Sequence, residues 1–355
     1  MRFIHIADMH FDAPFANLSK QEGVGDKRRL EQREIFSKII EYIKSEEIPY
    51  LFISGDLYEH QYVRKTTIEY INNLFKRIPE TKIFISPGNH DPNLKNSYYN
   101  EFEWSENVYI FNSEIQKYEF EEVDIYGFGF EDFYCMESKI EEIEIENKDK
   151  LNILITHGSL NASQTLELQY NPISESKIKK IGFDYIALGH IHKKIIEENI
   201  VYPGSPLSFG FDELGEHGML DVELLKNKLK INFIKLDEKE YIEKELDISE
   251  IYSEEELIEK INNVKIEENK LYKIILVGDK NIEINKNKII KIINQKNILK
   301  IKDKTKMAFD IERIKKENNI KSYYLEEIEK IKEEKKYTEE EIKQAIEIGL
   351  QILQN

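Results

Sequence analysis

The feature that most constrains this chain is a series of five short polar clusters, each of which begins where a short apolar stretch ends. The clusters are Asp8-Met9-His10, Gly55-Asp56, Gly88-Asn89-His90-Asp91, Thr156-His157-Gly158 and Gly189-His190-Ile191-His192. The stretches before them have the length and composition of buried strands. Because ligands bind at the carboxyl ends of the strands in an α/β sheet, we expect the clusters to meet in one site.

The spacing within the clusters suits metal binding. Alternate residues of an extended chain point the same way, so Asp8 and His10 can hold one cation. His190 and His192 can do the same, or each can bind a different cation. Carboxylate, amide and imidazole groups together suit manganese, iron, zinc or cobalt better than calcium, and no cysteine lies in the clusters.

Each cluster alone is a weak signal, because a histidine after a strand is usually a hydrogen-bonded polar residue. The joint pattern is much stronger, since five of the eight histidines fall in the clusters. His5 lies within a predicted strand and is expected to pack there. His60 is not expected to be catalytic, and His217, in a predicted loop, is assigned no role.

The first half of the chain alternates strand-like and helical stretches, which predicts an α/β core with a mixed sheet or two packed sheets, flanked by helices. Helices are predicted over 27–46 and 64–77. Strands are predicted over 3–7, 50–54, 82–86, 151–156 and 185–188, with a small antiparallel set over 108–111, 118–120 and 123–128. Hairpins are predicted over 194–197, 200–202, 218–225 and 228–236.

The pattern predicts three parts along the chain. Residues 1–240 form the domain with the clusters, and the charged stretch 236–244 marks its end. Residues 241–308 alternate strand and helix, as a small α/β domain does. Residues 309–355 are helical, and Thr338 with Glu341 predicts a capping box at the start of the last helix. The wide apolar stripe of that helix either docks on its own protein or binds a partner helix.

The charge distribution leaves the partner open. The net charge is −17, which at first argues against nucleic acid, and −15 of it lies in residues 1–240. Residues 271–310, however, hold ten lysines against four acidic residues. This excess is either compositional drift or a surface that faces phosphate groups. Cys135 is the single cysteine, and no apolar run is long enough to cross a membrane, so a cytoplasmic location is expected.

The order Asp-x-His, Gly-Asp, Gly-Asn-His-Asp, His and Gly-His-x-His resembles that of the calcineurin-like metallophosphoesterases over residues 1 to about 225. Five stretches resemble in particular the SbcD-type DNA exonucleases and their YhaO-like relatives. They are FIHIADMHFDAPF, GDLYEH, SPGNHD, LGHIHK and YPGSPLSFGFDE.

The resemblance implies a two-metal site with assigned residues. One metal would be bound by Asp8, His10, Asp56 and His192, and the other by Asp56, Asn89, His157 and His190, with Asp56 bridging. The metals would activate a hydroxide that attacks phosphorus. His90 would protonate the leaving oxygen, and Asp91 would orient His90. Asp12 and Glu59 are candidates to fix the ligand histidines, although some related nucleases carry a histidine at the position of Glu59.

The resemblance implies a manganese-dependent DNA nuclease, of the 3′–5′ exonuclease or endonuclease type, acting in DNA repair. The small α/β domain would cap the core, the partner would be an SbcC-like or YhaN-like coiled-coil ATPase, and a homodimer is possible. The same chemistry on a small nucleotide or another phosphoester is an alternative, because one fold hosts many substrates. A scaffold that has lost its chemistry is disfavoured by the complete ligand set.

Overall fold

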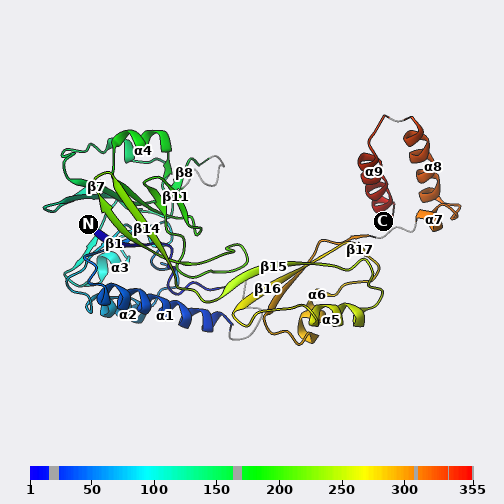
Figure 1. Ribbon diagram of the computed structural model, residues 1–355, viewed down its shortest axis with the longest axis horizontal. Helices are drawn as coiled ribbons and strands as arrows, with labels where there is room; N and C mark the ends of the chain where they lie inside the picture. Colours follow the sequence, from blue (N-terminus) through cyan, green and yellow to red (C-terminus); the bar gives the residue numbers. More distant parts are fainter. Residues whose placement is uncertain (16–23, 163–169, 308–310, 335, 354–355) are drawn as a thin grey trace. The chain divides into compact units, whose positions relative to one another are not determined.

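The computed structural model describes residues 1–15, 24–162, 170–307, 311–334 and 336–353. It divides into two compact units, Met1–Tyr241 and Ile242–Asn355 (Figure 1). All five polar clusters lie in the first unit, so its architecture positions the candidate site.

The first unit contains a six-stranded mixed sheet. In spatial order its strands are β14 (Lys228–Lys235), β13 (Gly218–Leu225), β1 (Arg2–Ile6), β2 (Tyr50–Ile53), β3 (Lys82–Ile85) and β4 (Val108–Ile110). Strands β1 to β4 run parallel, and β13 and β14 are antiparallel to their neighbours. The carboxyl ends of β1, β2 and β3 therefore meet at one edge.

A second six-stranded sheet packs on the first. In spatial order its strands are β11 (Ile195–Glu197), β12 (Ile200–Tyr202), β10 (Tyr185–Gly189), β7 (Leu151–His157), β6 (Val123–Gly127) and β5 (Gln116–Glu119). The four central strands are parallel, and the two outer ones are antiparallel to their neighbours. A parallel pair of short strands, β8 (Ser159–Leu160) and β9 (Pro172–Ile173), follows β7.

An apolar layer joins the two sheets. Phe3 and Phe52 of the first sheet have ring centroids 4.6 Å apart, and Phe3 meets Tyr185 of the second sheet at 4.9 Å. Because successive side chains of a strand point to opposite faces, Leu51 and Ile53 are buried on the other face of β2. Both faces of the strand are therefore apolar, as expected of a buried parallel strand.

Helices complete the first unit. The long helix α1 (Val24–Ser45) packs against α2 (Lys65–Phe75), with Phe36 and Phe75 in contact at a centroid distance of 5.9 Å (Figure 1). Ile178 of α4 (Glu175–Ile181) is buried with apolar residues of the second sheet. Two short elements, α3 (Tyr98–Glu101) and a 3₁₀ helix (Ile140–Glu142), lie in the connections.

The predicted α/β fold with two packed sheets is confirmed, and most strand and helix bounds agree within a few residues. The small antiparallel set predicted over 108–128 is wrong in one part. Strand β4 pairs in parallel with β3 in the first sheet, whereas β5 and β6 form a hairpin in the second. The chain crosses between the sheets after β4, a step for which the local sequence carries no signal.

The second unit has its own sheet and apolar core. Strands β15 (Glu240–Asp247), β16 (Lys270–Val277) and β18 (Ile298–Asp303) form a sheet, and α5 (Glu254–Asn262) and α6 (Lys286–Ile292) contribute Leu257 and Ile289 to its core. A short parallel pair joins β17 (Asp279–Lys280) to β19 (Lys306–Met307). Three lysines along and after β18, namely Lys300, Lys302 and Lys304, are exposed.

The rest of the second unit is helical, with α7 (Ile311–Ile314), α8 (Ile320–Glu333) and α9 (Glu339–Ile352). The predicted capping box of the last helix is present. The backbone amide of Glu341 donates to the Thr338 hydroxyl at 3.2 Å, and the amide of Thr338 donates to the Glu341 carboxylate at 2.7 Å. Among the helices of the described residues, none is long and apolar enough to cross a membrane.

Truncation of the layer between the sheets should destabilise the first unit strongly. Phe52→Ala removes a fully buried ring that contacts both Phe3 and Phe84, so we expect a loss of about 3–5 kcal/mol. Urea unfolding of the full chain, followed by circular dichroism, measures the shift. Ile196→Ala, at a side chain that is 46% exposed, is the control and should shift the midpoint little. Equal shifts for the two variants would contradict this description of the core.

Candidate metal centre

The polar clusters lie at the carboxyl ends of strands from both sheets, and backbone amides tie several of them together. The amide of Asp8 donates to the carbonyl of Gly55 at 3.1 Å, and the amide of His10 donates to the carbonyl of Asp56 at 2.8 Å. The amide of His190 donates to the Asp8 carboxylate at 3.0 Å. The ends of β1, β2 and β10, which belong to different sheets, are thereby held in one place.

The backbone turns sharply at the residues that carry the donors. Asp8, His10, Asp56 and His190 have φ values of 55°, 46°, 53° and 104°, in the left-handed region that side chains other than glycine rarely adopt. Such conformations persist only where the surrounding structure holds them. The interstrand hydrogen bonds supply that support, together with Gln32 of α1, whose amide donates to the carbonyl of His10 at 3.0 Å.

Glycines allow the strand ends to approach closely. A Cβ on Gly189 would collide with the carbonyl oxygen of Ser54, the residue that follows β2 of the other sheet. A Cβ on Gly88 would collide with the carboxylate of Asp56. The glycines of the sequence pattern are therefore required for packing around the donors rather than for turns alone.

The first group of donors consists of Asp8, His10 and His192, which offer ligand atoms within 4.8 Å of one another. The Nε2 atoms of His10 and His192 lie 3.1 Å apart. Asp56 lies next to this group, since its Oδ2 atom is 3.6 Å from Nε2 of His10.

The second group consists of Asp8, Asp56 and His157, again within 4.8 Å. Oδ2 of Asp56 lies 3.3 Å from Nε2 of His157. The Asn89 side-chain oxygen lies 3.0 Å from Nε2 of His157 and 3.2 Å from Nδ1 of His190. Asp56 therefore reaches both groups, and all seven residues that sequence reasoning assigned to metal come together.

The donor set fits two divalent cations. Asp8 and Asp56 are 0% and 1% exposed, and the ionic partners of Asp56 among the described residues are imidazoles rather than lysine or arginine. Two carboxylates buried this closely repel each other unless positive charge lies between them. Carboxylate, amide and imidazole donors suit transition-metal ions.

Acceptors from the protein fix the orientation of three candidate ligand histidines. Glu59 accepts from Nδ1 of His10 at 2.8 Å, and Glu213 accepts from Nδ1 of His192 at 2.6 Å. The backbone carbonyl of Ser54 lies 2.8 Å from Nδ1 of His157. In each case the other ring nitrogen is left facing the donor group, as in most histidine metal sites.

Sequence reasoning proposed Glu59 for this task but missed Glu213. Glu213 lies within the quoted stretch YPGSPLSFGFDE, and its second oxygen accepts from the amide of Phe209 at 3.0 Å. The other candidate, Asp12, does not contact a ligand histidine. Its carboxylate accepts from the amide of Arg64 at 3.1 Å and from the Thr67 hydroxyl at 2.7 Å.

His90 and Asp91 lie beside the donors but do not bind each other. Nδ1 of His90 lies 3.0 Å from the second oxygen of Glu59, so Glu59 occupies the orienting position that sequence reasoning gave to Asp91. The Asp91 carboxylate instead accepts from the amides of Leu57 and Gly88, both at 2.7 Å, and from the amide of Asp56 and the hydroxyl of Tyr99. Asp91 therefore shapes the loop that presents Asp56.

The remaining histidines lie outside the donor groups. His5 is fully buried, with Tyr185 and Ser54 as hydrogen-bonding partners, as expected for a packing residue. His60 packs on Phe133, and His217 is buried against Ser205. The packing role expected of His5 is confirmed.

The electrostatics of the metal-free site distinguish the imidazoles. Burial lowers the pKa values of His157 and His192, but Asp56 and Glu213 respectively outweigh it and raise both to about 9. Burial and the nearby His157 lower the pKa of His190 to about 3. Burial would raise the pKa of Asp56, yet His157 and its neighbours hold it well below its usual range.

Residues 1–194 match the family model described as calcineurin-like phosphoesterase. The chain belongs to this family. It is 27% identical over 246 residues to the uncharacterized metallophosphoesterase YhaO of Bacillus subtilis, a match that covers 66% of this chain and 60% of YhaO. The match therefore spans less than two thirds of that relative.

Two solved structures are similar to this calcineurin-like phosphoesterase at low identity. TT1561 of Thermus thermophilus gives a TM-score of 0.40 at 12% identity, over 65% of this chain and 98% of that one. A dimetal phosphatase from Danio rerio gives 0.41 at 10% identity, over 66% and 95%.

Loss of the Glu213 carboxylate should weaken metal binding by this calcineurin-like phosphoesterase. Glu213→Gln removes the charged acceptor behind His192, and we expect manganese affinity to fall about 10–100-fold. Isothermal titration of the metal-stripped protein measures the change. Glu216→Gln, three residues away at a surface position, is the matched control. Equal affinity of the Glu213→Gln variant and wild type would refute the assigned role.

Metal binding should also strengthen as pH rises from about 6.5 to 8.5. His157 and His192, with pKa values of about 9, hold protons in the metal-free site at neutral pH, and a metal must displace them. Below pH 9, the apparent affinity should fall about tenfold for each displaced proton when the pH is lowered by one unit. Titrations in buffers of different ionisation enthalpy count the released protons. Affinity that does not change with pH would show that neither proton is displaced.

Proposed function

We propose that this protein is a two-metal phosphodiesterase that cuts DNA with manganese. The observation that carries the proposal is the position of Asp56, whose Oδ2 atom lies 3.6 Å from His10 and 3.3 Å from His157, with His90 alongside. A carboxylate shared between two donor groups, next to a histidine outside the proposed ligand set, is what metal-assisted phosphodiester hydrolysis requires.

The assignment of ligands follows the two donor groups. Asp8, His10, Asp56 and His192 would hold one cation, and Asp56, Asn89, His157 and His190 the other. When bound, the two cations would supply Lewis-acid activation of water and of the phosphoryl oxygens. Glu59, Glu213 and the carbonyl of Ser54 keep the ligand rings in the orientation that this requires.

His90 is placed to donate a proton to the leaving oxygen. Burial would lower its pKa, but the hydrogen bond from its Nδ1 to Glu59 raises the pKa to about 9, so the ring is charged at neutral pH. The side chain is 46% exposed and lines a cavity of about 220 Å³ together with His10, His192 and Phe209. A charged imidazole in an open cavity can reach a substrate and act as a general acid.

An exposed aromatic side chain near the donors supports a nucleotide substrate. Tyr170 lies 4.9 Å from His190 and stacks with Tyr134, a residue that is 57% exposed. Exposed rings of this kind bind nucleic-acid bases by stacking. Phe15 and Phe209 stack with each other at 5.3 Å, but Phe15 is buried, so this pair forms part of the wall of the site.

The second unit supports the wider role that the sequence resemblance implies. Its β15–β16–β18 sheet would cap the core, and the exposed lysines of β18 would contact phosphate groups. Ile348 and Ile352 of α9 are 51% and 68% exposed, which supports docking of a coiled-coil ATPase partner. The resemblance supports a role in DNA repair, and the single free cysteine, Cys135, fits a reducing cytoplasm.

A small nucleotide is the second candidate substrate. The net charge of −15 in residues 1–240 favours it, because an acidic surface repels a long polyanion. Both candidates predict cleavage of a small diester, but only the DNA nuclease predicts cleavage of a DNA strand.

Replacement of His90 should separate proton donation from metal chemistry. His90→Ala should lower manganese-dependent cleavage of a labelled linear duplex and of single-stranded DNA about 10²–10⁴-fold. Cleavage of bis-p-nitrophenyl phosphate should fall much less, because nitrophenolate leaves without a proton. Asp56→Asn should abolish both reactions, and His60→Ala, the nearby control, should retain both.

The outcomes decide between the candidates. Full activity of the His90→Ala variant on DNA would refute its role as the acid. Cleavage of the small diester by wild type without any cutting of DNA would support the small-nucleotide alternative. Absence of both activities with manganese would refute the proposed function.

A further inference from the structure

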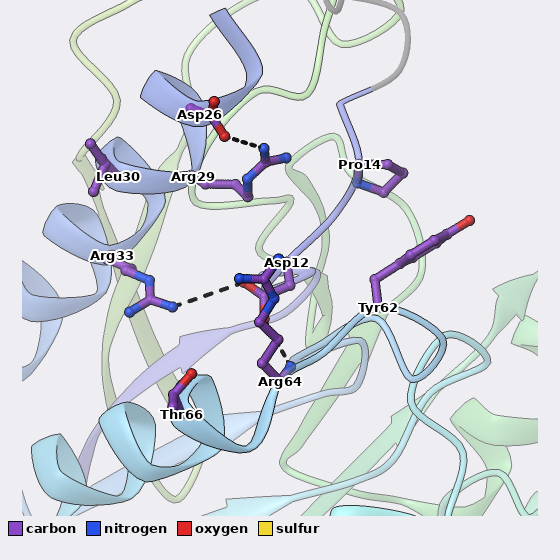
Figure 2. A pocket seen from close by; sticks show the side chains of 9 residues that line it. All are labelled: Asp12, Pro14, Asp26, Arg29, Leu30, Arg33, Tyr62, Arg64 and Thr66. Carbon is purple, nitrogen blue, oxygen red and sulfur yellow. Dashed lines mark hydrogen bonds and ion pairs between the residues drawn. The ribbon is translucent and has the colours of Figure 1, made fainter. Parts of the chain in front are cut away.

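A second, arginine-lined pocket lies in the first unit, apart from the donor groups. It has a volume of about 600 Å³, within the range of roughly 300–1,000 Å³ that is usual for ligand sites. Figure 2 shows three arginines around it, Arg29 and Arg33 from α1 and Arg64 from the residue before α2. The pocket is large enough for a nucleotide unit rather than a bare ion.

The arginines are only partly neutralised. Arg29 pairs with Asp26, whose side chain is 81% exposed. Solvent screening therefore weakens this ion pair. Arg33 lies 3.9 Å from Asp12, which already accepts two hydrogen bonds from the α2 end. The exposed guanidinium of Arg64 has no acidic partner among the described residues. The pocket is thus a basic site in an otherwise acidic unit.

The start of α2 adds to the positive potential. Arg64 is the N-cap of this eleven-residue helix, and its own side chain makes no capping hydrogen bond, although the Asp12 carboxylate accepts from its backbone amide at 3.1 Å. The first amides of a helix carry partial positive charge and attract anions. Tyr62, which is 53% exposed, lines the same pocket and offers a ring for stacking.

The pocket adjoins the proposed catalytic cavity through two loops. Asp12 and Pro14 line the pocket, while Ala13 and Phe15 of the same segment line the cavity that holds His90. The second loop leads from Glu59, which orients His90, to Tyr62 and Arg64. The same two loops therefore line the pocket and carry residues of the proposed catalytic cavity.

We propose that this pocket binds a phosphodiester that flanks the scissile one on the same nucleic-acid strand, with a base stacked on Tyr62. The inference rests on the proposed function and adds the substrate class, a strand rather than an isolated diester. Arg33 and Arg64 would contact the phosphate oxygens, since guanidinium forks match phosphate geometry. Asp12 would hold the two loops together, so that the pocket and His10 keep a fixed relation.

The test compares substrates that share one leaving group. The probes are p-nitrophenyl thymidine 5′-phosphate, which has a single diester, and tetrathymidylates with the p-nitrophenyl ester at the 5′ or the 3′ end. Release of nitrophenolate by the full-length protein with manganese gives kcat and KM for each. We expect wild type to have a lower KM for at least one tetranucleotide than for the mononucleotide.

The Arg33→Ala/Arg64→Ala variant should lose that advantage. Its KM for the preferred tetranucleotide should rise about tenfold or more, because charge-assisted hydrogen bonds are removed, and the salt dependence of KM should become shallower. Its KM and kcat for the mononucleotide should remain those of wild type. Arg77→Ala, an exposed arginine that pairs with Glu41 beyond the end of α2, is the matched control. Arg64→Ala alone, at an exposed side chain, tests the same point if the double variant is unstable.

The failures of the two proposals are distinguishable. A wild type with no preference for tetranucleotides, or a double variant that keeps the preference, would overturn the pocket assignment even if DNA is cut. A preference that depends on the arginines would uphold the pocket even if neither duplex nor single-stranded DNA is cut, and the proposed DNA nuclease alone would then fail.

Discussion

The first unit depends on the burial of two carboxylates, Asp8 and Asp56, at the point where its two sheets meet. Each is almost inaccessible to solvent, and imidazoles from both sheets hold the pKa of Asp56 low, whereas burial, with Asp56 nearby, leaves the pKa of Asp8 raised. Burial of charge without a compensating partner is strongly unfavourable. The histidines, the hydrogen bonds behind them and the glycines that allow close approach therefore form one interdependent arrangement, and the apolar layer between the sheets brings its halves together.

The same arrangement explains how one chain can present different environments to similar side chains. His157 and His192 face carboxylates and hold their protons firmly, whereas His190 lies beside another imidazole and does not. His90 is paired with Glu59 but stays open to solvent. The pKa values of His90, His157 and His192 are alike, so exposure to solvent is what sets His90 apart from the other two rings.

Much of the site was predictable because its donors follow strands directly. Asp8 and Asp56 lie just past β1 and β2 of the first sheet, and His157 ends β7 of the second, so the parallel strands bring these donors to the carboxyl edge of each sheet. The hydrogen bonds behind the ligands were less predictable, since Glu213 and Asp91 find their partners only after the loops fold. The turn of the chain from β4 into the second sheet had no local signal. The arginine pocket had none either, because α1 and the start of α2 are far apart in sequence.

The contact between Gly189 and the carbonyl of Ser54 has a consequence for how the unit behaves as a whole. It leaves no space for even one carbon atom between the sheets at the site, so the sheets cannot slide there without separating the donors. The interior of the unit and its metal centre should accordingly loosen together. A substitution in the aromatic layer between the sheets would then weaken metal binding, although it lies far from the donor groups. Conversely, a bound metal would stabilise the packing of the two sheets against unfolding.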